Sequence, residues 1–176
     1  MSDNGATFLP GADDGTTPII GRWFDGTQGY RGFKGDVYDG GLRVPAIAHW
    51  PARIAGSRTS QLQLDLTDVH ATVLAAAGLT PPTAIDGRSF LPPLVGSGPF
   101  TPRPFQVWYL PEGNQAAVLE GNWKATWRRD STTLFDIERD PAEQVNRWND
   151  HPNIVARLDS IRRREDRRAD HPRLSR

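Results

Sequence analysis

The sequence of 176 residues contains no cysteine. This absence excludes disulfide bonds, thiolate nucleophiles and zinc sites with cysteine ligands. The chain also has no run of about 18 apolar residues, the length that a membrane-spanning helix requires. Its first residues, MSDNGATFLPGADDG, contain neither a basic region nor an apolar stretch, so we expect no signal peptide and no membrane association in this chain.

The chain has no net charge either, because its 21 basic and 21 acidic side chains cancel. Bulk electrostatics therefore predicts no nucleic-acid partner. One region is basic: residues 157–176 hold eight arginines against four acidic residues. We expect a solvated helix there, with i, i+4 ion pairs such as Asp159 with Arg163. The alternative is a binding module whose arginine-rich tail docks on nucleic acid or on an acidic protein.

Lysine is rare in this sequence, with two residues against nineteen arginines. Lys34 lies in the segment YRGFKGDVYDGG, between glycines that let the backbone approach a ligand closely. A compact ammonium suits contact with a tetrahedral oxyanion in a narrow space, although a solvated loop lysine is the simpler interpretation. Lys124 follows Trp123 in a predicted hairpin, and we expect its side chain to face solvent.

The first half of the chain combines glycine-rich loops with short regular elements. The apolar run at 42–50 predicts a strand, and the alternation at 61–64 predicts a brief second one. The segment at 65–79 predicts a helix that Asp65 or Thr67 caps and Gly78 ends. Its expected buried face comprises Leu66, Val69, Val73, Leu74 and Ala77. A short helix is expected around 90–94.

The second half of the chain predicts an antiparallel meander followed by a helix. Four short β-prone runs lie at 105–110, 115–120, 123–128 and 133–137. Gly121 and Asn122 form a two-residue hairpin signal between the second and third runs. A helix is expected to begin near Pro152 and to bury Ile154, Leu158 and Ile161 on one face.

Oxygen-bearing side chains open the sequence at Asp3 and Asn4, followed by Gly5. A sharp bend at the glycine would let both side chains converge on a hard cation such as Ca²⁺, which takes about six to eight oxygen ligands. The pair supplies three oxygens at most, and an Asx-type turn is the simpler interpretation. The sequence contains no G-x-S-x-G elbow, no P-loop and no G-x-G-x-x-G fingerprint, which argues against serine hydrolases and nucleotide-binding folds.

Five segments together carry a family resemblance: SDNG at 2–5, RGFKGDVYDGGLRVPAIAHWP at 31–51, DLTDVHATVLAAAGL at 65–79, DGRSFLPPL at 86–94 and LFDIERDPAEQVN at 134–146. In order and spacing they resemble the C-terminal part of the formylglycine-dependent arylsulfatases. The resemblance implies an α/β fold in which residues 1–100 form the C-terminal part of an alkaline-phosphatase-like catalytic domain. Residues 101–176 would form a small subdomain of a four-stranded antiparallel sheet and a C-terminal helix.

The resemblance also implies roles for three residues. Asp3 and Asn4 look like the last pair of calcium ligands, and Lys34 looks like the catalytic lysine that contacts the sulfate group. An Asp-Asn pair, in place of the Asp-His pair of related phosphatase-like enzymes, favours a hard cation over zinc. Asp39 departs from the family pattern, which usually has glutamate there, and we expect its shorter side chain to weaken a structural contact.

Members of the family carry a C/S-x-P-x-R motif whose Cys or Ser becomes the formylglycine nucleophile. This sequence lacks the motif, since the nearest segment, SGPFT at 97–101, has no arginine. We therefore expect a truncated or mis-started fragment of a sulfuric ester hydrolase that is inactive alone. Its substrate would be a sulfate-ester small molecule or a sulfated glycan, and a related phosphonate or phosphate ester hydrolase is the alternative. Relatives are often periplasmic or secreted.

Overall fold

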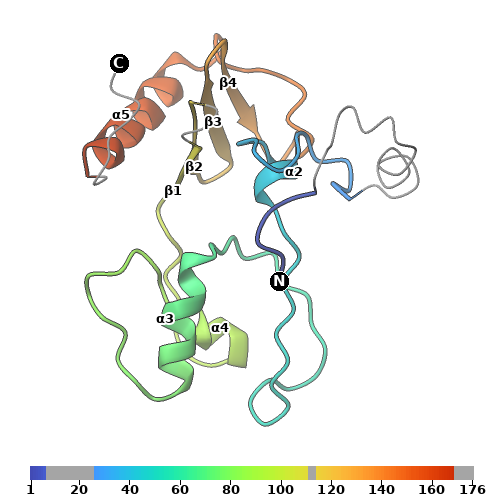
Figure 1. Ribbon diagram of the computed structural model, residues 1–176, viewed down its shortest axis with the longest axis vertical. Coiled ribbons are helices and arrows are strands. Elements are labelled where there is room, and N and C mark those ends of the chain that lie inside the picture. The colour runs from blue at the N-terminus through green and yellow to red at the C-terminus, as the bar shows by residue number, and fades with distance from the viewer. Residues whose placement is uncertain (7–25, 111–113, 169–176) are drawn as a thin grey trace, which may run out of the picture. The chain divides into compact units, whose positions relative to one another are not determined.

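The computed structural model describes residues 1–6, 26–110 and 114–168 of the chain, shown in colour in Figure 1. The chain forms two compact units. The first comprises Met1–Ala46 together with Pro104–Arg176, and the second comprises Ile47–Arg103. The expected division between residues 1–100 and 101–176 stays a prediction, and each unit is described separately below.

The first unit is built on a four-stranded antiparallel sheet with the strand order β1-β2-β3-β4. Its strands are β1 (Gln106–Leu110), β2 (Gln115–Glu120), β3 (Trp123–Arg128) and β4 (Ser131–Asp136). The predicted meander is confirmed, and β2 and β3 have the predicted bounds. Gly121 adopts φ +58° in the tight turn between them, a conformation that glycine reaches without steric cost.

Helix α5 (Pro152–Arg168) covers one face of this sheet, as Figure 1 shows. Its residues Leu158 and Ile161 are buried, 0% and 6% exposed, against Val118, Ala125 and Leu134 of three successive strands. The predicted apolar face of this helix is therefore confirmed. The core residues alternate along each strand, so every second side chain points to the other face.

Charged side chains of α5 form ion pairs with one another and with β2. The predicted pair of Asp159 and Arg163 is present, with Arg163 Nε 2.7 Å from the carboxylate. Arg157 pairs with Glu120 of β2 at 2.7 Å, and Arg164 pairs with Glu165 at 2.9 Å. These contacts are those of a solvated helix, which was the expectation for this basic region.

The opposite face of the sheet is covered by the loop around helix α2 (Asp39–Leu42), as Figure 1 also shows. Tyr38 is 1% exposed, and its ring meets the ring of Phe135 edge-on at a centroid distance of 6.0 Å. Because Phe135 follows Leu134 in β4, its side chain lies on the face that α5 does not cover. The first unit therefore has three layers: α5, the sheet, and the α2 loop.

The predicted strands at 42–50 and 61–64 are wrong. Residues 39–42 form α2, which buries Gly40 and Gly41, and residues 43–49 take part in no strand among those described. A strand needs a hydrogen-bonded neighbour. In the described sheet, each of the strands β1 to β4 pairs only with the strand before or after it in sequence, and none pairs with residues 42–50 or 61–64. Pro45 also removes one of the donors that a ladder would use.

The second unit contains helices α3 (Thr67–Ala76) and α4 (Leu91–Val95). Asp65 Oδ1 accepts the N–H of Thr67 at 2.9 Å, so one of the two predicted capping residues satisfies the first free N–H of the helix, while Leu66 occupies the N-cap position. Gly78 adopts φ +76° just beyond the end of the helix, as predicted. Within the described part of the chain, no helix has both the length and the apolar character needed to cross a membrane.

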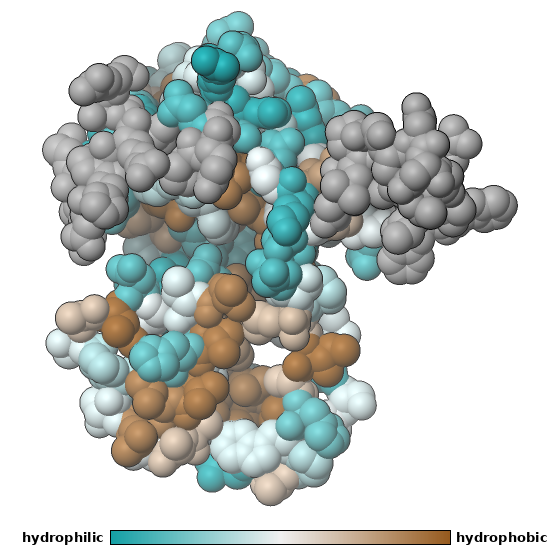
Figure 2. Space-filling model, in the orientation of Figure 1, coloured by the Kyte–Doolittle hydropathy of each residue, from teal (hydrophilic) through white to brown (hydrophobic). Residues whose placement is uncertain are grey.

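The predicted buried face of α3 is wrong. Its buried residues are Asp68, Ala71 and Thr72, whereas Leu66 and Val73 are 55% and 60% exposed. In the space-filling view, apolar side chains accordingly lie on the surface of this unit (Figure 2). The polar segment around Arg88, which follows α3 in sequence, binds the helix through hydrogen bonds. It covers the face with Asp68 and Thr72, so the predicted apolar face is left exposed.

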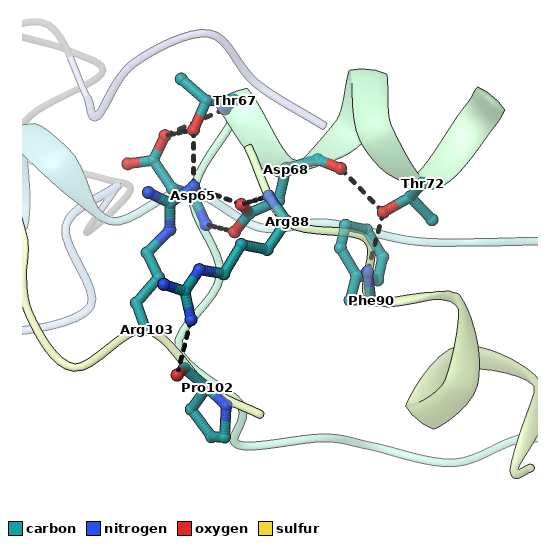
Figure 3. A network of polar contacts seen from close by, with 8 residues as sticks. All are labelled: Asp65, Thr67, Asp68, Thr72, Arg88, Phe90, Pro102 and Arg103. Atoms are coloured by element: carbon teal, nitrogen blue, oxygen red, sulfur yellow. Dashed lines mark hydrogen bonds and ion pairs between the residues drawn. The ribbon is translucent and has the colours of Figure 1, made fainter. Parts of the chain in front are cut away.

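That docking centres on the carboxylate of Asp68, shown with its neighbours in Figure 3. It accepts the N–H of Asp65 at 2.9 Å, the N–H of Arg88 at 2.7 Å, and the guanidinium of Arg103. A Cβ on Gly87 would lie less than 3.0 Å from the carbonyl oxygen of Thr67, so only glycine fits there. The D-G-R-S-F motif is therefore a helix-docking segment.

Replacing Asp68 with asparagine should lower the free energy of unfolding by about 2 kcal/mol, because an amide presents one acceptor where the carboxylate serves three donors. Urea denaturation followed through the amide signals of α3 measures this change. Asp86→Asn, an exposed change in the same motif, is the matched control and should cost less than about 0.5 kcal/mol. Equal costs for the two variants would contradict the assignment.

Candidate functional site

The structure brings the opening segment next to the loop that contains Lys34. The N–H of Gly5 donates to the carbonyl of Gly41 at 2.9 Å, and the N–H of Lys34 donates to the carbonyl of Ala6 at 2.8 Å. Residues 2–6 therefore run alongside residues 31–43, which we call the lysine loop. Asp3 and Asn4 precede the first of these bonds, and Lys34 makes the second.

Glycines permit this close approach. A Cβ on Gly5 would lie less than 3.0 Å from the carbonyl oxygen of Gly40, and a Cβ on Gly40 would lie less than 3.0 Å from that of Gly32. Gly32 and Gly35, on either side of Lys34, have φ values of +82° and +87°. Such positive φ values turn the chain sharply at little cost for glycine alone. Lys34 is thus presented at a tight bend.

The predicted ligand side chains are accessible. Asp3 and Lys34 are exposed and Asn4 is half-buried, while the hydroxyl of Ser2 donates to the carbonyl of Asn4 at 3.0 Å. Within residues 1–6, 26–110 and 114–168, neither Lys34 Nζ nor the Asp3 carboxylate has a hydrogen-bond or ion-pair partner in the structure. Neither group would have to give up a contact with these described residues in order to bind a ligand.

A carboxylate and an amide oxygen are donors that Ca²⁺ prefers, so Asp3 and Asn4 fit part of a calcium site. They supply three oxygens at most, against the six to eight or so that the ion takes. No group of three or more His, Cys, Asp or Glu side chains in the described part of the chain could hold a metal ion. The two residues therefore suit a site completed by other ligands.

Lys124 was predicted to face solvent, and this prediction is wrong. Its side chain is 0% exposed, with Nζ 2.5 Å from Asp39 Oδ1 and 2.8 Å from Glu143 Oε1. The reason is its strand position: Trp123 and Ala125 pack on the α5 side, which directs Lys124 towards the lysine loop. The scarcity of lysine was the sequence signal that singled it out. We call Asp39, Lys124 and Glu143 the ion triad.

The backbone of the lysine loop is also bound to Glu143. The N–H of Asp39 donates to Glu143 Oε2 at 2.7 Å, and Arg31 Nη1 donates to the carbonyl of Glu143 at 2.8 Å. The Arg31 guanidinium lies 4.1 Å from the centre of the Tyr38 ring, a cation–π contact. Burial raises the pKa of the Glu143 carboxyl, and the ammonium of Lys124 opposes this effect.

The segment LFDIERDPAEQVN at 134–146 shapes the turn that presents Glu143. The Asp140 carboxylate accepts the N–H groups of Gln144 and Val145 at 3.1 and 2.8 Å. Asn146 Oδ1 accepts the N–H of Leu134 at 3.0 Å, which ties the end of the segment to β4. These residues hold a turn in which Glu143 adopts φ +53° and points into the protein.

The comparisons with known proteins agree with this architecture. The sequence model of the family described as N-sulphoglucosamine sulphohydrolase, C-terminal, matches residues 26–165. N-acetylgalactosamine-6-sulfatase of Canis lupus familiaris is 37% identical over 131 residues, which cover 72% of this chain and 23% of that protein. N-acetylgalactosamine-6-O-sulfatase of Bacteroides thetaiotaomicron is 28% identical over 150 residues, covering 75% and 29%. The chain thus spans about a quarter of the length of these curated relatives.

Solved structures show the same fold. A sulfatase of Bacteroides thetaiotaomicron, described with the metabolism of multiple glycosaminoglycans, matches with a TM-score of 0.71 at 24% identity. The match covers 83% of this chain and 34% of that one. The structure of Ps i-CgsB matches with a TM-score of 0.65 at 25% identity, over 83% of this chain and 33% of that one. These likenesses confirm the predicted α/β fold class.

Proposed function

The chain belongs to the sulfatase family, as a C-terminal portion of it, and on that premise we propose that it supplies sulfate and metal contacts to a sulfuric ester hydrolase. One observation carries the proposal: the backbone bonds of Gly5 and Lys34 hold the Asp3-Asn4 pair beside the Lys34 bend. The exposed side chains of Asp3 and Lys34 thus belong to two segments that are bonded to each other, on a support of closely packed glycines.

Lys34 is the proposed catalytic and substrate-binding residue. Its ammonium would contact the sulfate group and stabilise negative charge that builds on the sulfate oxygens in the transition state. A lysine suits this task because a point charge with three donors adapts to a tetrahedral group. The side chain of Lys34 is exposed at the bend between Gly32 and Gly35, so an ester's anionic head can reach it.

Asp3 and Asn4 are the proposed metal ligands, for Ca²⁺. A bound calcium ion supplies Lewis-acid stabilisation of anionic oxygens. The carboxylate of Asp3 would bind the cation by charge, and the amide oxygen of Asn4 would add a neutral donor beside it. Gly5 fixes where both residues lie, because its N–H is bonded to Gly41 at 2.9 Å.

The 176-residue chain contains no cysteine and no C/S-x-P-x-R motif, so it offers no residue for conversion to formylglycine. We propose that it does not hydrolyse sulfate esters by itself. Sulfated glycans are the proposed substrate class, since the relatives that are about a third identical include N-acetylgalactosamine-6-sulfatases. A steryl-sulfatase of Mus musculus is also 30% identical, which keeps a sulfate ester of a smaller alcohol as the second candidate.

The proposal is tested by NMR titration of the 176-residue chain with sodium sulfate and, separately, with calcium chloride. Sulfate should shift the amide signals of Lys34 and Gly35, and calcium should shift those of Asn4 and Gly5. Both affinities should be weak, with dissociation constants on the order of 1 mM, because the chain provides few ligands. Lys34→Met should abolish the response to sulfate, and Asp3→Ala should abolish the response to calcium.

The matched controls are Arg139→Met and Asp130→Ala, exposed changes of the same charge outside residues 2–6 and the lysine loop. Both control variants should respond to sulfate and calcium as the unchanged chain does. Responses that survive Lys34→Met and Asp3→Ala, or shifts centred elsewhere, would overturn the assigned sites. Hydrolysis of an aryl sulfate by the chain alone would overturn the proposal that it lacks a nucleophile.

A further inference from the structure

The ion triad is a buried charged cluster that the proposed chemistry does not use. Lys124 and Glu143 are both 0% exposed, and the side chain of Asp39 is 15% exposed. Burying charges is costly, and apolar side chains of similar volume commonly stabilise a fold as well as a buried ion pair does. What a charged cluster adds is a defined geometry, because each partner must keep its distance and direction to the others.

The triad connects two parts of the chain that are far apart in sequence. Lys124 lies in the middle of β3, Glu143 lies in the turn after β4, and Asp39 is the first residue of α2 in the lysine loop. Glu143 contacts this loop at both ends, through the N–H of Asp39 at 2.7 Å and through Arg31 at 2.8 Å. The turn after β4 therefore binds the lysine loop on both sides of Lys34.

Hydrogen bonds lead from the triad to the proposed ligands. The N–H of Gly40, next to Asp39, donates to the carbonyl of Arg31 at 2.6 Å and closes the lysine loop. The carbonyl of Gly41 accepts a hydrogen bond from the N–H of Gly5, and the carbonyl of Ala6 accepts one from the N–H of Lys34. The sheet also contacts the bend at Lys34 directly, because Gln115 Nε2 of β2 donates to the carbonyl of Gly35 at 3.2 Å.

We propose that Lys124 and Glu143 are positioning residues: through Asp39 they fix the lysine loop on the sheet, and so set where Lys34 lies relative to Asp3 and Asn4. The inference rests on the proposed function, since only that function gives the placement of Lys34 a purpose. Lys124 and Glu143 themselves are too deeply buried to touch a substrate. Asp39 joins them to the loop. Although its side chain is shorter than the glutamate usual in the family, its carboxylate lies 2.5 Å from the Lys124 ammonium.

The test is amide hydrogen exchange, measured by NMR on the full 176-residue chain and on Asp39→Asn. This isosteric change removes the charge at the loop end of the triad and leaves the pair of Lys124 and Glu143 intact. Exchange protection of the Gly5 and Lys34 amides should fall at least tenfold. Amides of β2 and β3 should change less than threefold, because the sheet keeps its own ladder and its α5 core.

Thr126→Val is the matched control. Thr126 is fully buried on the same strand and the same face as Lys124, and its hydroxyl is 2.7 Å from that of Thr133. This variant should destabilise the sheet without a selective effect on the Gly5 and Lys34 amides. A second variant, Lys124→Met with Glu143→Gln, removes the buried charges together and should also lower protection at these two amides selectively.

Wild-type protection at Gly5 and Lys34 in both the Asp39→Asn chain and the double variant would overturn the inference. So would an equal loss in Thr126→Val, because the triad would then act through general stability alone. The sulfate titration separates this failure from that of the proposed function. If sulfate does not shift Lys34 in the unchanged chain, the function fails, whereas selective loss of protection in Asp39→Asn still supports the positioning role.

Discussion

Replacing Lys124 with methionine should lower the free energy of unfolding by about 3–5 kcal/mol, the cost typical of breaking a buried ion pair from one side. The substitution keeps an unbranched side chain, one atom shorter, but leaves the Glu143 carboxylate, which is fully buried, without its cation. It also removes the charge that faces Asp39 Oδ1. Because small domains are stable by about 5–15 kcal/mol, this loss would remove a large share of the total stability.

Chemical denaturation followed by tryptophan fluorescence measures this loss. Adding Glu143→Gln to Lys124→Met should recover most of the stability, because no uncompensated carboxylate then remains at the centre of the cluster. Lys34→Met is the matched control, since it removes the other lysine of the sequence from an exposed position and should cost less than about 0.5 kcal/mol. Similar costs for the two lysine variants would show that the triad does not stabilise the fold.

Replacing Gly40 with alanine should lower the free energy of unfolding by about 2–3 kcal/mol and displace the lysine loop. A Cβ there would lie less than 3.0 Å from two backbone carbonyl oxygens, those of Gly32 and Arg31. Backbone atoms cannot rotate away as a flexible side chain can. Either α2 or the backbone at Arg31 and Gly32 must therefore move. The Gly5 and Lys34 amide signals should shift, because their hydrogen bonds depend on that packing.

Gly29→Ala is the control for this experiment. Gly29 has φ +79° but no atom within 4 Å of an added Cβ, so the change carries conformational cost without a steric clash. It should cost about 1–2 kcal/mol and leave the Gly5 and Lys34 signals unshifted. If the Gly40 variant is as stable as the Gly29 variant and its signals stay in place, the close packing of the lysine loop is not what holds Lys34.

Local patterns predicted the elements whose packing follows from their own periodicity. The β-prone runs and the hairpin signal between them gave the bounds of β2 and β3, and the spacing of Ile154, Leu158 and Ile161 identified the buried face of α5. The strands pair with the strands next to them in sequence, and the buried face of α5 follows from the spacing of its own apolar residues, so short windows of sequence contain the deciding information. The cap of α3 by Asp65 was predicted for the same reason, since donor and acceptor are two residues apart.

The predictions that proved wrong depend on partners distant in sequence. The face of α3 was misassigned because Arg88 and Arg103, 20 and 35 residues away, bind Asp68 and bury a carboxylate. The segment 42–50 has a strand-like composition but no strand beside it in the described sheet. Composition measures a preference for extended structure, whereas a strand also requires a hydrogen-bonded neighbour.

The sequence by itself determined the meander, the C-terminal helix, the family and the residue types suited to a calcium ion and a sulfate group. The tertiary structure alone decided that Gly5 and Lys34 share a hydrogen-bonded support, and that Lys124 is buried with acids 85 and 19 residues away in sequence. Residue type fixes which charge a side chain carries. Whether that charge meets solvent, a ligand or a buried partner depends on which segments the fold brings to the same face of the sheet.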